Sequence, residues 1–211
     1  MRERPHRQAV RTGTGFADLT EAELGGRDFA YADLTGARLA LARLIGADLT
    51  GARLTHAHLS GAHLSGARLI GAHLDGVNLT GADLTGTLAT GADLSRARVR
   101  YTRLTGTDLV GADLNGATLA DSDLTRADLS RARLVDTDLT RANLSGADLT
   151  GAVGLSFPLL TGVRWDLGTV WPGDVREQIE EHSEEIAAGL FQVRGGRGHD
   201  RSPSPAPDPV R

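Results

Sequence analysis

The chain has 211 residues, a net charge of −4 and no cysteine. This length suits one domain, the small charge gives no general attraction to nucleic acid or acidic membranes, and the missing cysteines exclude disulfides and thiolate-ligated zinc. The polar segment 1–15 lacks the apolar core of a signal peptide, and no window approaches the roughly 18 apolar residues of a membrane span, so we expect a cytoplasmic protein without membrane contact.

A strict five-residue repeat follows this segment. From Leu19 to Leu149 one position recurs every five residues without an insertion, and 24 of its 27 occurrences are leucine. Alanine stands two residues earlier in 20 cases, and glycine stands two residues later in 16. Five residues rotate a helix position by about 140° and move a strand position to the opposite face, so either element exposes half of the leucines. A backbone that turns a corner once per repeat buries all of them, which predicts a β-solenoid over residues 16–153.

The repeated unit appears as Ala32-Asp33-Leu34, Ala82-Asp83-Leu84 and Ala142-Asn143-Leu144, and in this it resembles the pentapeptide-repeat proteins. The resemblance implies an all-β solenoid, a right-handed quadrilateral parallel β-helix in which four units form one coil. The 27 units then make about seven coils, and residues 20 positions apart stack at the strand spacing of ~4.8 Å. The alternative solenoid is a left-handed hexapeptide β-helix, which requires a period of six that this register never has.

The residue before each leucine is expected to point outward, so 20-residue stacking arranges these side chains in four columns. One column runs from Asp28 to Asp148 and differs from the others in its charge. Like charges one strand apart are unfavourable unless something compensates them, and Arg126 and Arg131 are nearby. The candidate partner-binding acidic stripe consists of three aspartates of this column and two on the next face, namely Asp93, Asp108, Asp113, Asp128 and Asp148. Leu88, in the same column, is a candidate exposed apolar contact.

The histidines and the remaining polar residues indicate neither a metal site nor an active site. His58, His63 and His73 lie within one coil length but on three different faces, so they diverge and cannot together form a zinc site. The sequence contains no phosphate loop, nucleophile elbow or H-E-x-x-H motif, and leucine fills the interior. We therefore predict no enzyme activity, no catalytic, cofactor-binding or metal-binding residues, and no cofactor.

Residues 154–193 are expected to close the open end of the solenoid, whose leucines and backbone would otherwise be exposed. Asp174 and Glu177 have capping-box spacing and precede apolar residues at helical spacing, which predicts an amphipathic helix over about 174–188. The apolar face of this helix is a candidate cap or dimer surface, formed by Val175, Ile179, Ile186 and Leu190. A monomer and a C-terminal homodimer both remain open. The proline- and charge-rich tail 194–211 is expected to be disordered.

Two functions remain open. The first is a non-enzymatic interaction scaffold with an unknown protein partner. The second follows from the resemblance, because the best-known members of the family imitate DNA and bind DNA gyrase or topoisomerase IV, which protects these enzymes from quinolones or toxins. Arginines at 38, 43, 53, 68, 98, 103 and 133 interrupt the acidic columns, so the scaffold is the first expectation. In both cases the partner is a protein, and direct binding of nucleic acid is not expected.

Overall fold

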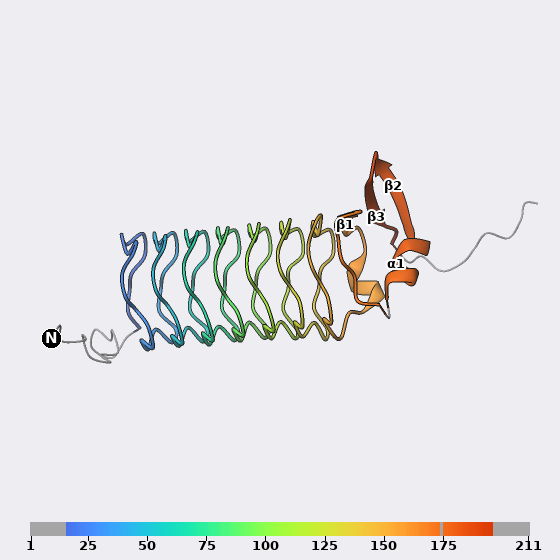
Figure 1. Ribbon diagram of the computed structural model, residues 1–211. Helices are drawn as coiled ribbons and strands as arrows, with labels where there is room; N and C mark the ends of the chain where they lie inside the picture. Colours follow the sequence, from blue (N-terminus) through green and yellow to red (C-terminus); the bar gives the residue numbers. More distant parts are fainter. Residues whose placement is uncertain (1–15, 174, 196–211) are drawn as a thin grey trace, which may run out of the picture.

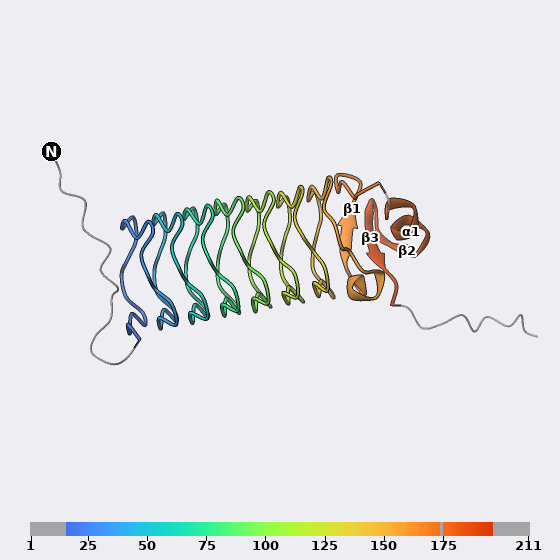
Figure 2. The ribbon, with the colours of Figure 1, turned by 90° about the horizontal axis from the view of Figure 1, so that it is seen from below.

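The computed structural model describes residues 16–173 and 175–195, so the segment 1–15 and the tail from residue 196 lie outside the described residues. The chain winds into a rod of stacked coils, with the C-terminal elements gathered at one end (Figures 1 and 2). Parallel bridges join residues 20 positions apart along the whole repeat. The first bridge joins Asp18 to Arg38, and the last one of this spacing joins Arg133 to Val153. The predicted β-solenoid and its 20-residue stacking are therefore confirmed.

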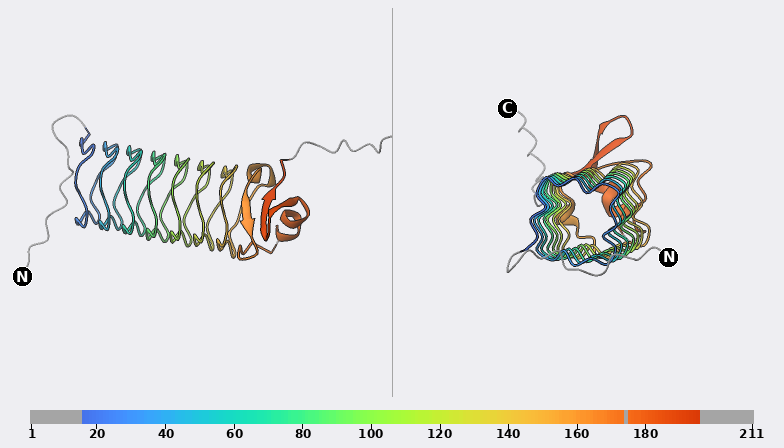
Figure 3. Two further views of the ribbon diagram at one scale, coloured as in Figure 1. Left: turned by 90° about the horizontal axis from the view of Figure 1, so that it is seen from above. Right: turned by 90° about the vertical axis from the view of Figure 1, so that its left-hand side faces the viewer.

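Each coil has four sides when the rod is viewed along its axis (Figure 3). On every side, backbone hydrogen bonds connect one coil with the next. The amide of Leu74 donates to the carbonyl oxygen of Asp93 over 2.7 Å, and the amide of Asp93 donates to Ala72 over 2.9 Å. Between these bonds the leucine and alanine side chains point inward and form one continuous buried core. Each buried leucine contributes about 1.5–3 kcal/mol of transfer free energy, so the core stabilises each coil through its neighbours.

The corners explain the glycine of the repeat. The residue two positions after each leucine position of the repeat adopts left-handed backbone angles. Gly51 has a φ of 63°, and eleven residues other than glycine have φ between 56° and 61° at equivalent positions. A large side chain at such a corner lies over the corner residue of the next coil. A Cβ on Gly51 would come within 2.6 Å of the Tyr31 ring. Glycine is therefore needed for its backbone angles and, beneath a large side chain, for its small size.

Threonine replaces alanine at several inward positions without leaving a polar group unpaired. Thr87, for example, is fully buried, and its hydroxyl donates a hydrogen bond to the carbonyl oxygen of Leu64 in the preceding coil over 2.9 Å. Three further hydroxyls make the same bond over 2.8 Å, those of Thr102, Thr107 and Thr137. Because a buried hydroxyl is costly only when it lacks a partner, these threonines fit the core and add a link between coils.

The C-terminal elements form a small cap on the rod. They are a 3-10 helix η1 (Phe157–Leu160), strand β1 (Arg164–Asp166), helix α1 (Arg176–Glu181), strand β2 (Ser183–Ala187) and strand β3 (Leu190–Val193). The three strands make an antiparallel sheet in the order β1-β3-β2. Within β1, Arg164 pairs with Asn143 of the rod on one side and with Gln192 of β3 on the other. The cap sheet is therefore continuous with one side of the solenoid.

Both tryptophans fill the interior at this end. Trp165 and Trp171 follow Arg164 and Val170, which pair with the last coil of the repeat, so the two indoles occupy the inward position that leucine holds elsewhere. Both are buried, with their rings edge-to-face and 6.2 Å apart between centroids, and Phe191 stacks on Trp165 at 4.6 Å. The larger rings cover the last leucines, and β3 covers the backbone edge of β1.

The predicted helix over about 174–188 is wrong in its extent. Residue 174 lies outside the described residues, α1 covers only 176–181, and residues 183–187 form β2. The hydroxyl of Ser183 donates to the carbonyl oxygen of Ile179 over 2.7 Å and accepts the indole N–H of Trp165 over 2.9 Å. This contact fixes the chain where the helix ends. Pairing of β2 with β3, through a turn at Gly189, then overrides the helical spacing of the apolar residues.

Candidate functional site

The charged side chains lie on the outside of the rod, and one column of them carries the candidate site. We call the outward residues Asp28, Asp48, Arg68, Leu88, Asp108, Asp128 and Asp148 the acidic column. Parallel bridges place all seven in register on one side of the rod, with each member one coil from the next. The stacking of the three C-terminal aspartates is therefore confirmed, and their role in binding a partner stays a prediction.

The aspartates of the column also have a structural role. One carboxylate oxygen of Asp108, Asp128 and Asp148 accepts the backbone amide two residues later, over 3.0, 2.9 and 2.8 Å respectively. Asn78 and Asn143 make the same turn with their side-chain amide oxygens, over 3.1 and 3.2 Å. The turn requires an oxygen acceptor but no charge. Asparagine can therefore replace these aspartates with the turn preserved and the charge removed.

Among the described residues, one ion pair compensates negative charge within this column. Arg68 lies 3.9 Å from Asp48. Among the residues that the structure describes, no cation forms an ion pair within 4.0 Å of Asp108, Asp128 or Asp148. Arg126 and Arg131, the residues expected to compensate them, lie at corners and extend over the glycines of the next coil.

The neighbouring side of the rod holds the other two candidate aspartates. Asp93 and Asp113 are paired in register by a parallel bridge, and Arg133 approaches Asp113 to 3.7 Å in the next coil. This side therefore carries a shorter acidic run that ends at an arginine. Leu88 is exposed in the acidic column, between Arg68 and Asp108. Its placement agrees with the expected outward position, and contact with a partner stays a prediction.

Arginine–carboxylate pairs occur on the other sides of the rod. They join residues 20 positions apart, at 3.2–3.9 Å: Arg38–Asp18, Arg43–Glu23, Arg103–Asp83 and Arg133–Asp113. In exposed positions such pairs contribute about 0–1 kcal/mol each. They make these sides of the rod more balanced in charge than the C-terminal half of the acidic column.

A tighter ionic cluster lies at one corner, and sequence reasoning missed it. Asp121 accepts two hydrogen bonds from Arg141, over 2.6 and 2.7 Å, and a third from Arg100 over 3.2 Å. The hydrogen bond from Arg141 is the largest cause that lowers the pKa of Asp121 from 3.8 to about 2; partial burial opposes it, and Arg100 adds to it. Asp121 and Arg141 occupy corner positions, where the repeat pattern gives only glycine a role.

This cluster predicts a pH dependence of stability. Because folding lowers the pKa of Asp121, its pairing contributes fully above the ordinary value of 3.8 and is lost as the pH falls through about 2. We expect the free energy of unfolding to fall over this window, and to fall less steeply in Asp121→Asn. Urea unfolding of both proteins at pH values across this window measures the two slopes. The comparison with the variant is needed because the pKa of Asp123 is also lowered. Equal slopes would show that Asp121 is not the source.

The histidines diverge as expected. His58 pairs with Arg38 and Asn78, whereas His63 and His73 belong to two other sides of the rod. Over the described residues, no group of three or more histidine, cysteine, aspartate or glutamate side chains could hold a metal ion. The same part of the chain contains no helix of the length and apolar character that a membrane crossing requires.

The four residues of the predicted helix face are separated in the cap. Val175 precedes α1 and is half-buried, and Ile179 is fully buried within α1. Ile186 is exposed on β2, and Leu190 begins β3. They do not form one helix face, so that face is withdrawn as a dimer surface. A cap role remains only for Val175 and Ile179, which pack with the core.

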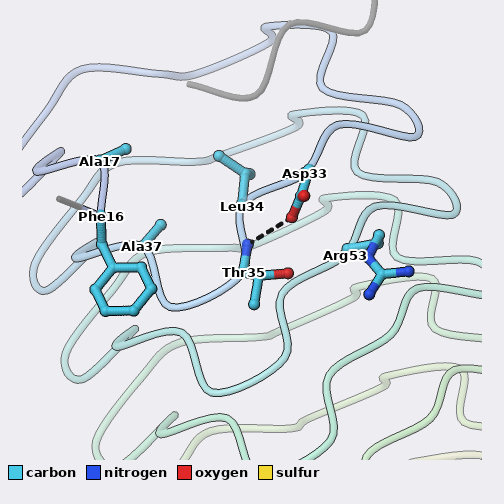
Figure 4. Close-up of a pocket in the computed structure, with 7 residues that line it drawn as sticks. All are labelled: Phe16, Ala17, Asp33, Leu34, Thr35, Ala37 and Arg53. Carbon is cyan, nitrogen blue, oxygen red and sulfur yellow. Dashed lines mark hydrogen bonds between the residues drawn. The ribbon is translucent and has the colours of Figure 1, made fainter. Parts of the chain in front are cut away.

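A recess lies at the opposite end of the rod, beside Phe16 (Figure 4). Asp33 accepts the amide of Thr35 over 3.1 Å, and Arg53 pairs with Asp33 in the coil ladder. The recess thus brings together one aromatic ring, one carboxylate and one guanidinium. The carboxylate serves a turn, as its counterparts do elsewhere in the rod, and this recess carries no catalytic assignment.

Comparisons with known proteins found several to which this chain is similar. Among solved structures, HetL of the cyanobacterium Nostoc sp. strain PCC 7120, involved in heterocyst differentiation regulation, is 33% identical, with 74% of this chain and 75% of HetL covered and a TM-score of 0.39. Trypsin-treated QnrB1, a plasmid-mediated fluoroquinolone resistance protein, is 24% identical, with 66% and 78% covered and a TM-score of 0.41. A pentapeptide repeat protein from the thylakoid lumen of Arabidopsis thaliana is 30% identical, with 54% and 69% covered and a TM-score of 0.32.

A search of curated proteins found no match. A family model described as pentapeptide repeats matches in eight copies, over residues 17–55, 47–86, 92–131 and 118–153. These ranges cover more than half of the chain, and they coincide with the part whose coils stack every 20 residues. The chain therefore belongs to the pentapeptide-repeat family.

Proposed function

We propose that this chain is a non-enzymatic scaffold of the cytoplasm, a right-handed rod of about seven coils that binds a partner protein on its outer sides. The interior supports this proposal, because apolar side chains fill it and the chemically varied side chains point outward. The acidic column is the surface that carries the proposal. Asp108, Asp128 and Asp148 stack there, and none of them forms an ion pair with a described residue. Their uncompensated negative charge attracts a basic surface of a partner.

The test removes charge from this column while keeping its turns. In Asp108→Asn/Asp128→Asn/Asp148→Asn each asparagine retains the oxygen that accepts the turn amide, as Asn78 and Asn143 do. We expect the wild-type rod to capture a partner from a lysate of its own cells, and the variant to lose it. The matched control makes the same charge change on other sides, in Asp83→Asn/Asp123→Asn/Asp138→Asn, and should retain the partner. Equal capture by all three proteins would contradict the role of the acidic column.

DNA mimicry is the second candidate function, and the same three aspartates favour it. Carboxylates repeated at the coil spacing form a line of negative charge. The basic surface of a DNA-binding protein attracts such a line as it attracts the phosphates of DNA. Supercoiling by purified gyrase, titrated with the same three proteins, separates this function from a general scaffold. Inhibition or quinolone protection that only the Asp108→Asn/Asp128→Asn/Asp148→Asn variant loses supports a gyrase ligand. No effect of the wild type on gyrase would leave the scaffold with another partner.

A further inference from the structure

A second surface, of opposite charge, lies in the middle of the rod. Four arginines and one tyrosine fall within eight residues of a single coil: Arg96, Arg98, Arg100, Tyr101 and Arg103. We call these five residues the basic band. Arg98 and Arg103 are outward residues of two adjacent sides, and Arg96 and Tyr101 are corner residues with left-handed backbone. The band therefore spans two adjacent sides of the rod, neither of which is the side of the acidic column.

The guanidinium groups of the band are more exposed than the carboxylates beneath them. The side chain of Arg96 is 76% exposed and its partner Asp75 only 24%, while Arg103 is 66% exposed and its partner Asp83 26%. Both ion pairs are long, at 3.9 Å. The carboxylates are held inward by hydrogen bonds; the hydroxyl of Thr85 donates to Asp83 over 2.6 Å. A molecule that approaches this surface therefore meets positive charge first, although the formal charges nearly balance.

The remaining members of the band add to this surface. Arg100 donates to the half-buried Asp121, and its guanidinium carbon lies 5.3 Å from the centroid of the exposed Tyr101 ring. Arg98 stands between Asn78 and Thr118 in its column, and no carboxylate of the described residues lies within 4.0 Å of its side chain. Exposed tyrosine and arginine together are typical of the residues that dominate binding energy at protein interfaces.

The second coil shows that this difference in exposure is not equally large along the rod. Arg43 and Glu23 form an ion pair on one of the same sides of the rod, but Arg43 is 53% exposed and Glu23 78%. There Glu23 is the more exposed partner, and in the neighbouring pair Arg38 at 66% only slightly exceeds Asp18 at 57%, so the outer layer of this coil is less positive than that of the basic band. Arg38, Arg43 and Arg53 therefore provide a natural comparison, with three arginines in one coil and no exposed tyrosine between them.

We infer that the basic band is a docking surface for an acidic segment of a partner protein. Carboxylates of such a segment can reach Arg96, Arg98 and Arg103 in the outer layer, and the Tyr101 ring offers an apolar contact at the adjoining corner. Charge complementarity favours a short acidic peptide over nucleic acid, because the band is one coil high and the next coils present Asp83 and Asp123 on the same side. This inference rests on the proposed scaffold role and concerns a surface separate from the acidic column.

The test measures binding of a fluorescein-labelled deca-glutamate peptide by fluorescence anisotropy. We expect the wild type to bind it, and Arg96→Gln/Arg98→Gln/Arg103→Gln to bind about tenfold more weakly. The matched control, Arg38→Gln/Arg43→Gln/Arg53→Gln, loses the same charge and should change the affinity less than about twofold. Tyr101→Ala should also weaken binding. Thermal unfolding of every variant checks that the rod is intact, because these side chains are exposed.

Three outcomes would overturn the inference: no binding of the peptide to the wild type, an equal loss in both arginine variants, or tighter binding of a single-stranded oligothymidine than of the peptide. The last outcome would assign the band to nucleic acid. The variant Asp108→Asn/Asp128→Asn/Asp148→Asn should bind the peptide at least as tightly as the wild type. A failure of the band thus remains distinct from a failure of the acidic column, which is measured by partner capture.

Discussion

Leu74→Asp is expected to unfold the middle of the rod. Leu74 is fully buried, and its amide is part of the ladder that joins two central coils. The substitution removes about 1.5–3 kcal/mol of transfer free energy and places an unpaired carboxylate among apolar side chains, which costs several kcal/mol more. This total approaches the whole stability of a typical domain, about 5–15 kcal/mol. Far-UV circular dichroism during heating should show a melting midpoint at least about 10 °C lower, or no cooperative transition.

Leu88→Asp is the matched control for this prediction. It makes the same chemical change in a central coil, but Leu88 points outward and is exposed. We expect its melting curve to remain close to that of the wild type, with a change within about 0.5 kcal/mol. If Leu74→Asp melts like the wild type, Leu74 is not part of the core. If both variants unfold, the central coils tolerate no added charge, and the burial of Leu74 does not explain why Leu74→Asp unfolds.

The rod could be predicted almost completely from the sequence, because one physical requirement repeats in every unit. A leucine every fifth residue must be buried, and only a backbone that turns once per repeat can bury all of them. The resemblance to pentapeptide-repeat proteins adds that four units form a coil of 20 residues, so that Asp108 stacks on Asp128 and Asp148, and the structure confirms this stacking. The repeat has no insertion in this region, so register errors cannot accumulate.

The cap could not be predicted in the same way. Val175, Ile179 and Ile186 have helical spacing, yet only Ile179 lies within a helix. The decisive contacts are the β2–β3 hairpin, the pairing of β3 with β1 and the bond from Trp165 to Ser183. The last two join residues at least 18 positions apart in the sequence. A local pattern of apolar residues carries no information about such contacts, so tertiary pairing overrides it.

The exposure of the charged groups could not be predicted from the sequence either. The sequence shows that Arg103 stacks near Asp83, and equal numbers of opposite charges then suggest a neutral surface. In the structure, the turn hydrogen bonds hold the carboxylate inward while the longer arginine side chain extends over it. The sign of the outer layer is thus set by side-chain length and by turn geometry. The same reasoning applies to Asp121, which lies inside a layer formed by Arg100 and Arg141.

Gly154→Ala is expected to have the second large effect on stability, through the junction between rod and cap. Gly154 has a φ of 88°, and a Cβ there would lie 2.5 Å from Val135 Cγ2 and 2.7 Å from the Val135 backbone nitrogen. The left-handed conformation costs an alanine about 1–2 kcal/mol, and overpacking against backbone adds about 1–3 kcal/mol. We expect the free energy of unfolding to fall by about 3 kcal/mol in a urea titration.

Gly151→Ala separates the two causes. Gly151 has a φ of 68°, but the nearest atom to an added Cβ is Arg131 Cγ at 3.8 Å, an ordinary van der Waals distance. This variant should therefore lose only the conformational contribution of about 1–2 kcal/mol. If Gly154→Ala and Gly151→Ala lose the same stability, the contact with Val135 relaxes without cost, and backbone conformation alone explains the glycine. A larger loss in Gly154→Ala shows that the close approach of Val135 to residue 154 is part of what joins the last coil to the cap.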